Sequence, residues 1–301
     1  MTSQATTNAH AAAAALKTFA FGVEIETIGR SATTLARSVA TAMGWTQLPG
    51  NSQVRDNEGR VWAFVYDASI SGTGCEMVTP KLRYDDIETL QNVVRTIRRA
   101  GARAHASCGT HIHIDASTLD AGAVGRVAKL FAAKENMIFL AAEATHRMTN
   151  RFCAPTSQDF IKKVANKRPK TLSEMSSLWY GEGGRSLSRY HSSRYRALNF
   201  HSLFYRGTIE FRLFNSELHA GKIKSYIQLC LGLIAYAKVT TNARFAPTAM
   251  EEVTYERTRI FLKNIGFRGE EFETARLHLT RAAKAADERR AAQPAQLAQA
   301  A

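Results

Sequence analysis

The stretch from Phe21 to Thr27 constrains the fold most, because apolar and acidic residues alternate along it. A period of two is that of a β-strand, in which successive side chains point to opposite faces. Glu24 and Glu26 therefore share one face, and the apolar residues cover a core on the other. Two neighbouring carboxylates repel each other unless a cation lies between them, and such oxygen ligands suit Mg²⁺. Taken alone, the pattern is more typical of a half-exposed antiparallel strand.

The same alternation recurs twice, at residues 110–115 and 208–214. The polar faces carry His111, His113 and Asp115 in the first stretch and Thr208, Glu210 and Arg212 in the second. Three such strands in one sheet would bring carboxylates, imidazoles and a guanidinium together on one face. The repetition favours a metal or phosphate site built on a sheet.

Composition indicates a globular protein and excludes several classes. A content of 45% hydrophobic and 22% charged residues is that of a soluble chain. The longest uncharged apolar run, about residues 229–237, is too short to cross a bilayer, so we expect no membrane segment. Residues 1–15 lack the basic start of a signal peptide. The cysteines, Cys75, Cys108, Cys153 and Cys230, form no Cys-x-x-Cys pair, which favours free thiols and a cytoplasmic location.

The net charge of +14 is concentrated between residues 159 and 212, where eleven Lys and Arg face four acidic residues. This segment indicates contact with an anionic partner, such as a nucleotide, a nucleic acid or a teichoic-type polymer. Solubility alone would explain the same charge, and the two interpretations are compatible.

The order of expected elements indicates an α+β domain: a curved, mainly antiparallel sheet with helices on one face and the site on the other. Amphipathic patterns and caps predict helices near residues 31–43, 85–100, 120–142, 222–236, 250–265 and 270–286. The domain is expected to span 18–240, with C-terminal helices at 241–286 packed on it. Residues 1–17 and 287–301 are expected to be disordered tails. Residues 156–196, with a Gly-rich turn at 180–185, are expected to form a lid or insertion.

Five short motifs occur between about Phe19 and Ala237. They are Phe21-Gly-Val-Glu-Ile-Glu, Asp67-x-Ser69 with Glu76-Met-Val-Thr-Pro80, Gly109-Thr-His-Ile-His-Ile-Asp115, Arg196-x-x-Asn199 and Thr208-Ile-Glu-Phe-Arg212. Their order resembles that of the amidoligases, members of the carboxylate–amine ligase superfamily that includes glutamine synthetase and glutamate–cysteine ligase. The resemblance implies a glutamine-synthetase-like catalytic domain. It also implies an enzyme that uses ATP and Mg²⁺, or Mn²⁺, to form an amide bond through an acyl phosphate.

The resemblance also implies a metal cluster. Glu24 and Glu26 would hold different metal ions, Glu76 would join one of them, and Glu210 would complete the cluster. One histidine of the His-x-His strand, His111 or His113, would bind metal or nucleotide phosphate.

Further roles concern the cofactor and catalysis. Arg212 would contact the transferred phosphoryl group, and Arg196 and Asn199 would belong to the cofactor-binding residues. His113 or a carboxylate such as Glu210 would take a proton from the attacking amine.

Two other functions remain open from the sequence. The His-x-His-x-Asp strand also resembles those of zinc-dependent hydrolases, although no further histidine pair follows it. The charge alone would suit a non-enzymatic nucleic-acid-binding module, but acidic residues on strand faces would repel phosphate without a metal. The acid and the amine are not identified; a peptide, a cell-wall component or a nucleobase-linked acceptor would each be compatible.

Overall fold

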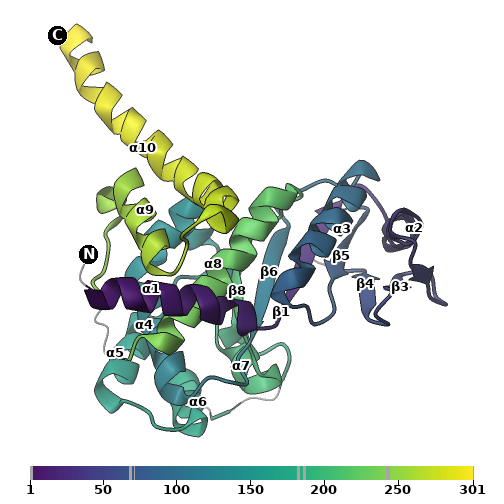
Figure 1. The fold of residues 1–301 in the computed structure, drawn as a ribbon, viewed down its shortest axis with the longest axis horizontal. Helices are drawn as coiled ribbons and strands as arrows, with labels where there is room; N and C mark the ends of the chain where they lie inside the picture. Colours follow the sequence, from purple (N-terminus) through teal and green to yellow (C-terminus); the bar gives the residue numbers. More distant parts are fainter. Residues whose placement is uncertain are drawn as a thin grey trace.

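The computed structural model describes residues 3–67, 70, 72–181, 184–185, 188–241 and 245–300, with side chains for those between 4 and 292. An open eight-stranded antiparallel sheet runs through it, in the order β2-β3-β4-β5-β1-β6-β8-β7 (Figure 1). The strands are β1 Phe21–Ile28, β2 Thr46–Gln47, β3 Gln53–Arg55, β4 Val61–Val65, β5 Gly74–Val78, β6 Gly109–Asp115, β7 Leu198–Asn199 and β8 Thr208–Asn215. The predicted α+β class with an antiparallel sheet is confirmed.

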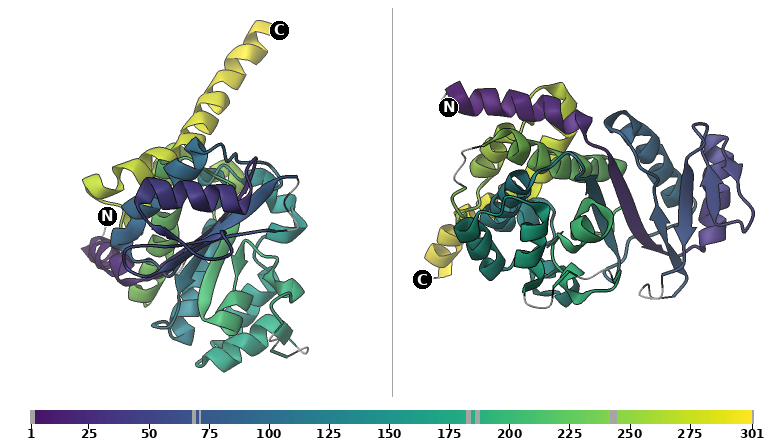
Figure 2. Two further views of the ribbon diagram at one scale, coloured as in Figure 1. Left: turned by 90° about the vertical axis from the view of Figure 1, so that its right-hand side faces the viewer. Right: turned by 90° about the horizontal axis from the view of Figure 1, so that it is seen from below.

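Ten α-helices accompany the sheet in the described part of the chain. They are α1 Ser3–Ala15, α2 Ala32–Met43, α3 Ile87–Arg99, α4 Ala121–Ala141, α5 Gln158–Lys167, α6 Leu172–Tyr180, α7 His201–Arg206, α8 Ala220–Val239, α9 Tyr255–Asn264 and α10 Glu273–Ala300. Helix α8 packs against α1, α3, α4 and α10 and against strand β6. Figure 2 shows α3 and α8 on the same side of the central strands.

Local sequence signals explain where the elements begin and end. Ser31 caps α2 by accepting a hydrogen bond from the amide of Thr34, and Gly44 ends that helix in the left-handed conformation. In the strands, every second side chain is buried against the helices, as Val23 and Ile25 of β1 show. The period-two pattern therefore divides the sheet into an apolar helix-covered face and a polar face.

A β-bulge in β8 adjusts the register beside the polar face. Ile112 of β6 pairs with Phe211, but Thr110 pairs with Phe214, so β8 contains one extra residue between these pairs. The extra residue turns Phe214 towards the helices, where its ring stacks on Tyr226 of α8 with centroids 4.4 Å apart. Glu210 lies before the bulge and belongs to the polar face, and Arg212 is one of the two β8 residues within the bulge.

The N-terminal segment is not a disordered tail, as was expected for residues 1–17. Residues 3–15 form α1, which packs on α8. Alanine is the strongest helix former, and its small side chain lets two helices approach closely. Ala9 and Ala12 are fully buried, and a Cβ on Gly266 would lie 2.8 Å from the amide nitrogen of Ala13.

The C-terminal region also departs from the expected tail after residue 286, because α10 continues to Ala300 and projects from the body (Figure 1). Its first half packs on α8, and Arg281 makes a two-point ion pair with Glu143 at 2.6–2.8 Å. Glu143 also accepts a hydrogen bond from Lys222 of α8. Gly232 of α8 leaves space for Phe267, since a Cβ there would lie 2.8 Å from the ring.

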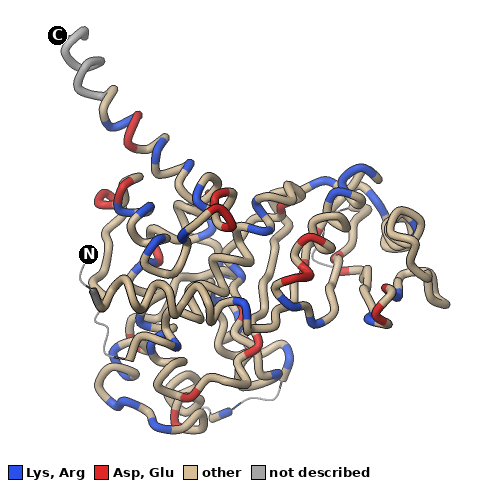
Figure 3. The backbone as a smooth tube through the Cα atoms, in the orientation of Figure 1, with Lys and Arg blue, Asp and Glu red and all other residues tan. Residues whose placement is uncertain are grey.

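Residues 156–196 contain two helices, α5 and α6. Helices α5 and α6 pack on α4 through buried Phe160, Val164 and Met175. Glu182 and Gly183 of the Gly-rich turn lie outside the described residues, as does Ser69 of the second motif. Figure 3 shows basic residues along α5 and the stretch leading to α6. A mobile lid stays a prediction.

The four cysteines are buried free thiols. Among the described residues, no helix combines the length and hydrophobicity needed to cross a membrane.

Candidate active site

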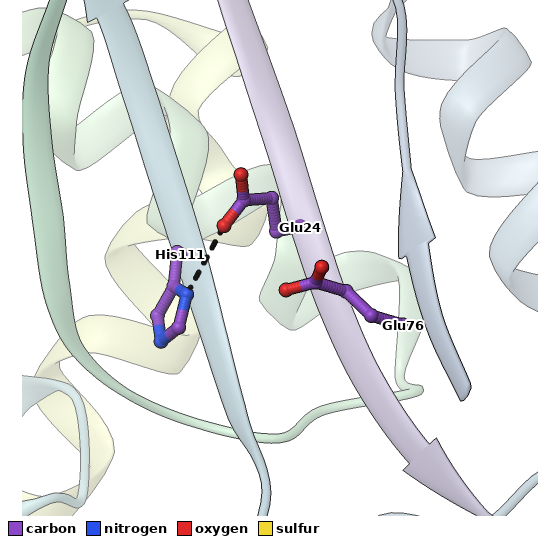
Figure 4. A group of neighbouring side chains, drawn as sticks. All are labelled: Glu24, Glu76 and His111. Carbon is purple, nitrogen blue, oxygen red and sulfur yellow. Dashed lines mark hydrogen bonds and ion pairs between the residues drawn. The ribbon is translucent and has the colours of Figure 1, made fainter. Parts of the chain in front are cut away.

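The register of the central strands brings the predicted ligands together on the polar face. The cross-strand pairs are Glu24 with His111, Glu26 with Glu76, and His113 with Glu210. Directly opposed residues of antiparallel strands have Cβ atoms about 4.5–5.5 Å apart, so their side chains meet. Figure 4 shows Glu24, Glu76 and His111, which come from three adjacent strands and converge on one point.

Three groups of side chains have ligand atoms within 4.8 Å of one another. They are Glu24, Glu76 and His111; Glu24, His113 and Glu210; and Glu26, Asp67 and Glu76. Glu24 and Glu76 each belong to two groups, so these are neighbouring sites that share ligands. Every group contains at least two carboxylates, a donor set that suits Mg²⁺ or Mn²⁺ better than the histidine-rich sets typical of catalytic zinc.

Glu24 lies between the two imidazoles. Its Oε2 is 3.3 Å from Nδ1 of His111, and its Oε1 is 3.4 Å from Nε2 of His113. Burial alone would raise the pKa of Glu24, but the two imidazoles hold it well below its ordinary value. Glu24 is therefore ionised at neutral pH.

His113 offers a ring nitrogen to the centre of the cluster. Nε2 is buried, has no hydrogen-bond partner and lies 3.7 Å from Oε1 of Glu210. Burial lowers the pKa of His113, but Glu210 and Glu24 raise it more strongly, so the net direction is upward. A buried nitrogen without a partner between two carboxylates fits a cation that would take all three as ligands.

Glu76 is electrostatically strained in the absence of a cation. Burial and the charges of Glu24 and Glu26 raise the pKa of Glu76 to about 9. Asp67 adds to this rise, and Arg189 opposes it. A bound divalent cation would relieve the repulsion among these carboxylates.

Glu210 is held rigidly. Asn199 Nδ2 donates a hydrogen bond to Oε2 at 2.6 Å, and Arg212 Nη1 donates to Oε1 at 2.5 Å. Burial raises the pKa of Glu210, but Arg212 and His113 lower it to about 2. Nε of Arg212 is buried without a partner, so the guanidinium keeps a donor for an anion beside the cluster.

Two hydrogen bonds, one from Gly109 and one from Ser216, fix Glu26. The amide of Gly109 donates to Oε2 of Glu26 at 2.6 Å. The hydroxyl of Ser216 donates to the carbonyl oxygen of Glu26. The end of β1 is thereby tied to the start of β6 and to the chain after β8.

A pocket of about 310 Å³ adjoins one end of the cluster. It is lined by backbone of β1 and by Glu24, His113, Lys81, Asp115 and Arg206, among others. Lys81 and Asp115 form an ion pair at its rim. Nη1 of Arg206, at the end of α7, lies 3.9 Å from Oε1 of Glu24. The pocket thus places two cationic side chains beside the cluster of carboxylates and imidazoles.

Arg147 marks the other end of the cluster and is not indicated by any sequence pattern. It is about nine-tenths buried and donates to the carbonyl oxygen of Cys108 at 3.3 Å, and its Nε has no partner. A Cβ on Gly109 would lie 3.2 Å from Nη2 of Arg147 and 3.1 Å from Nε2 of His111. A guanidinium and an imidazole therefore border the same glycine.

The structure gathers six predicted site residues into one cluster and adds Asp67. The six are Glu24, Glu26, Glu76, His111, His113 and Glu210, and Arg212 is bonded to the last. Asp67 belongs to a motif that could have identified it. Lys81 and Arg206 of the pocket lie in no motif.

Asn199 and Arg196, which were predicted to bind the cofactor, both form hydrogen bonds within the protein, and their role with a cofactor stays a prediction. Nδ2 of Asn199 donates a hydrogen bond to Glu210, and Oδ1 of Asn199 accepts one from the backbone amide of His201 at 2.8 Å, so Asn199 orients Glu210. Arg196 donates to the carbonyl oxygen of Pro155 at 2.9 Å. That bond helps to fix the segment before α5.

Comparison with known proteins gives one result. A search of curated proteins finds no match. The family model described as "putative amidoligase enzyme" matches residues 17–234, which is most of the chain and includes every residue of the cluster. This chain therefore belongs to the amidoligase family, whose name denotes enzymes that form amide bonds.

Proposed function

We propose that this protein is an ATP- and Mg²⁺-dependent carboxylate–amine ligase that forms an amide bond through an acyl phosphate. The observation that carries the proposal is the shared ligand Glu24. It joins two carboxylate–imidazole groups, one of which includes Glu210 with Arg212 bonded to it. Family membership supports amide-bond formation, and the donor sets support a hard divalent cation.

The reaction balances as two displacements. The substrate carboxylate attacks the γ-phosphorus of ATP, and ADP leaves with the electron pair of the broken bond. The amine then attacks the carbonyl carbon of the acyl phosphate, and phosphate leaves as the amide forms. Mn²⁺ or Mg²⁺, when bound, supplies charge neutralisation for phosphoryl transfer.

The chain's own residues would divide this work. Glu24, Glu26, Asp67, Glu76 and Glu210 would hold the cations. Arg212 would use its unpartnered Nε on an equatorial phosphoryl oxygen. His113 or a neighbouring carboxylate would accept the proton that the amine loses.

The two ends of the cluster suggest an order of substrates along β6. Lys81 and Arg206 in the pocket beside His113 would pair with nucleotide phosphates. Arg147 lies beside Gly109, which precedes His113 by four residues on β6, or about 13 Å at 3.3–3.4 Å per residue. Its guanidinium would bind the acid substrate at the end opposite the nucleotide.

Zinc-dependent hydrolysis is the second candidate, because two histidines do lie in the cluster. Each of them groups with two glutamates, whereas catalytic zinc sites commonly combine several nitrogen or sulfur ligands. The ligase is therefore favoured by the donor chemistry.

The deciding experiment incubates the protein with Mg²⁺, ATP, hydroxylamine and a panel of carboxylic acids. The ligase predicts ADP, phosphate and a hydroxamate that forms only with ATP. AMP and pyrophosphate would indicate activation through an adenylate instead. Hydrolysis without nucleotide, abolished by a chelator and restored by zinc, would establish the hydrolase.

A further inference from the structure

Three arginine and three aromatic side chains contact one another in a row along a surface beside the cluster. This surface, called here the arginine–aromatic ladder, consists of Arg151, Phe152, Tyr195, Arg194, Tyr190 and Arg189. The guanidinium of Arg151 lies 4.5 Å from the centroid of Phe152, and Phe152 meets Tyr195 edge-on at 5.1 Å. Arg194 lies over both tyrosines, at 5.1 Å from Tyr195 and 5.4 Å from Tyr190. Arg189 lies 5.7 Å from Tyr190.

The ladder is accessible and positively charged. Tyr190 is 70% exposed and Phe152 is 43% exposed, values that distinguish them from packed core rings. Arg151 and Arg189 are exposed, and Arg194 is half-buried. Within the described ranges, none of the three arginines forms a salt bridge with an acidic side chain. Three cations close together repel one another unless an anion joins them.

Backbone hydrogen bonds fix the ladder to the active site. The amide of Ala154 donates to the carbonyl oxygen of Tyr195, and the amide of Ala197 donates to that of Ala154. The amide of Arg212 in turn donates to the carbonyl oxygen of Ala197 at 2.8 Å. Tyr195 therefore lies two residues before Ala197, which is hydrogen-bonded to β8, the strand that carries Glu210. At the other end of the ladder, the positive charge of Arg189 acts to lower the pKa of Glu76.

We infer that the arginine–aromatic ladder binds single-stranded nucleic acid and leads one of its bases to the acidic cluster. Unpaired bases stack on exposed aromatic rings and on guanidinium planes, and arginines pair with the phosphates between them. A duplex would offer the phosphates but not the faces of its stacked bases. An acidic peptide would use the charges and leave Tyr190 and Phe152 without a role.

The inference deepens the proposed function and rests on it for one point, the identity of the substrate. It assigns the reacting carboxylate or amine to a modified base within a single strand. The binding surface itself requires neither ATP nor metal, so it can be tested separately from catalysis.

The experiment measures fluorescence anisotropy of labelled twelve-nucleotide oligo(dT) and oligo(U) with the full chain, in EDTA and without nucleotide. Tyr190→Leu should weaken binding by about tenfold or more, whereas Tyr190→Phe should retain it. Tyr255→Leu, at an exposed tyrosine on α9, is the matched control and should bind like the wild type. Comparison of the two oligonucleotides distinguishes DNA from RNA as the carrier.

Salt dependence gives the second readout. The Arg151→Gln/Arg189→Gln variant should reduce the slope of log Kd against log salt by about 1.4, since each single-strand phosphate contact contributes about 0.7. Equal binding of a duplex, full competition by poly-glutamate, or equal losses in the Tyr190→Leu and Tyr255→Leu variants would overturn the inference. A chain that forms hydroxamates but binds no oligonucleotide would refute the ladder and keep the ligase. A chain that binds oligonucleotides through the ladder but never consumes ATP would do the reverse.

Discussion

Asn199 donates a hydrogen bond from Nδ2 to Oε2 of Glu210 over 2.6 Å, and both side chains are buried. Oδ1 of Asn199 accepts a hydrogen bond from the backbone amide of His201, which fixes the orientation of the side-chain amide. Glu210 is therefore held in one orientation within the cluster. Asn199 thus orients a residue of the cluster.

Asn199→Ala should lower Mn²⁺ affinity by about 10–100-fold, because partners of metal ligands commonly contribute that much. Titration calorimetry measures the effect, and circular dichroism checks the fold. Asn92→Ala, at an exposed position on α3, is the control and should bind as the wild type does. Unchanged affinity in Asn199→Ala would remove Asn199 from the metal site.

The Glu24→Gln/Glu26→Gln variant should lose divalent-cation binding. Glu24 contributes to two of the three ligand groups and Glu26 to the third, so all three are damaged. The measurement is the rise in Tm on adding Mg²⁺, which should disappear. Glu88→Gln, at an exposed glutamate on α3, should keep the full rise. A persisting rise in the double variant would show that the cation binds elsewhere.

The metal-free protein should become less stable as pH rises from about 5 to about 9. The pKa of Glu76 is about 9 in the fold against an ordinary value of 4.5, so the folded state keeps a proton that the unfolded state has lost. This contribution is complete below pH 4.5 and is lost as pH rises through the folded value. Thermal unfolding in EDTA should show a steeper fall for the wild type than for Glu76→Gln. Parallel curves would contradict the raised pKa.

Arg212→Lys should abolish most ATP-dependent hydroxamate formation while Mn²⁺ still binds. A lysine keeps the charge beside Glu210 but cannot offer two planar N–H groups to phosphoryl oxygens. The assay compares hydroxamate yield with calorimetric metal affinity in the same preparation. Loss of both together would mean that Arg212 serves the metal site only.

Arg147→Lys should raise KM for the acid substrate by about tenfold or more, with KM for ATP and metal affinity unchanged. The side chain lies at the Gly109 end of the cluster, away from the proposed nucleotide pocket. Steady-state ADP release with each substrate varied in turn separates the two constants. Arg98→Lys, on the exposed surface of α3, is the control. A larger effect on KM for ATP would reverse the assigned order of substrates.

The strands of the cluster could be predicted because both signals used are local. Glu24, His113 and Glu210 alternate with apolar residues in their own strands, and the pattern depends on nothing else in the chain. Their convergence on one sheet was also predictable from three matching patterns. The bulge in β8 could not be predicted from the sequence, because it depends on how β8 pairs with β6, where Thr110 lies opposite Phe214.

The remaining features depend on tertiary contacts. Arg147 lies in a short 3₁₀-helix, where no periodicity reveals which side chains turn inward. The alanine-rich start of the chain was interpreted as a tail, yet it is a helix because α8 offers it a partner. The composition of a segment indicates its own preferences but not the stabilisation that it gains by packing on another helix.

The region matched by the family is shorter than the unit that has to fold. The match ends at residue 234, inside α8. Beyond that limit, Phe267 packs against Gly232 and Arg281 forms an ion pair with Glu143. A protein that ended at residue 234 would keep every residue of the cluster, but the apolar surface of α8 that Phe267 covers would be exposed to solvent. Contacts from residues outside the matched region therefore complete the packing of the helices that cover the sheet.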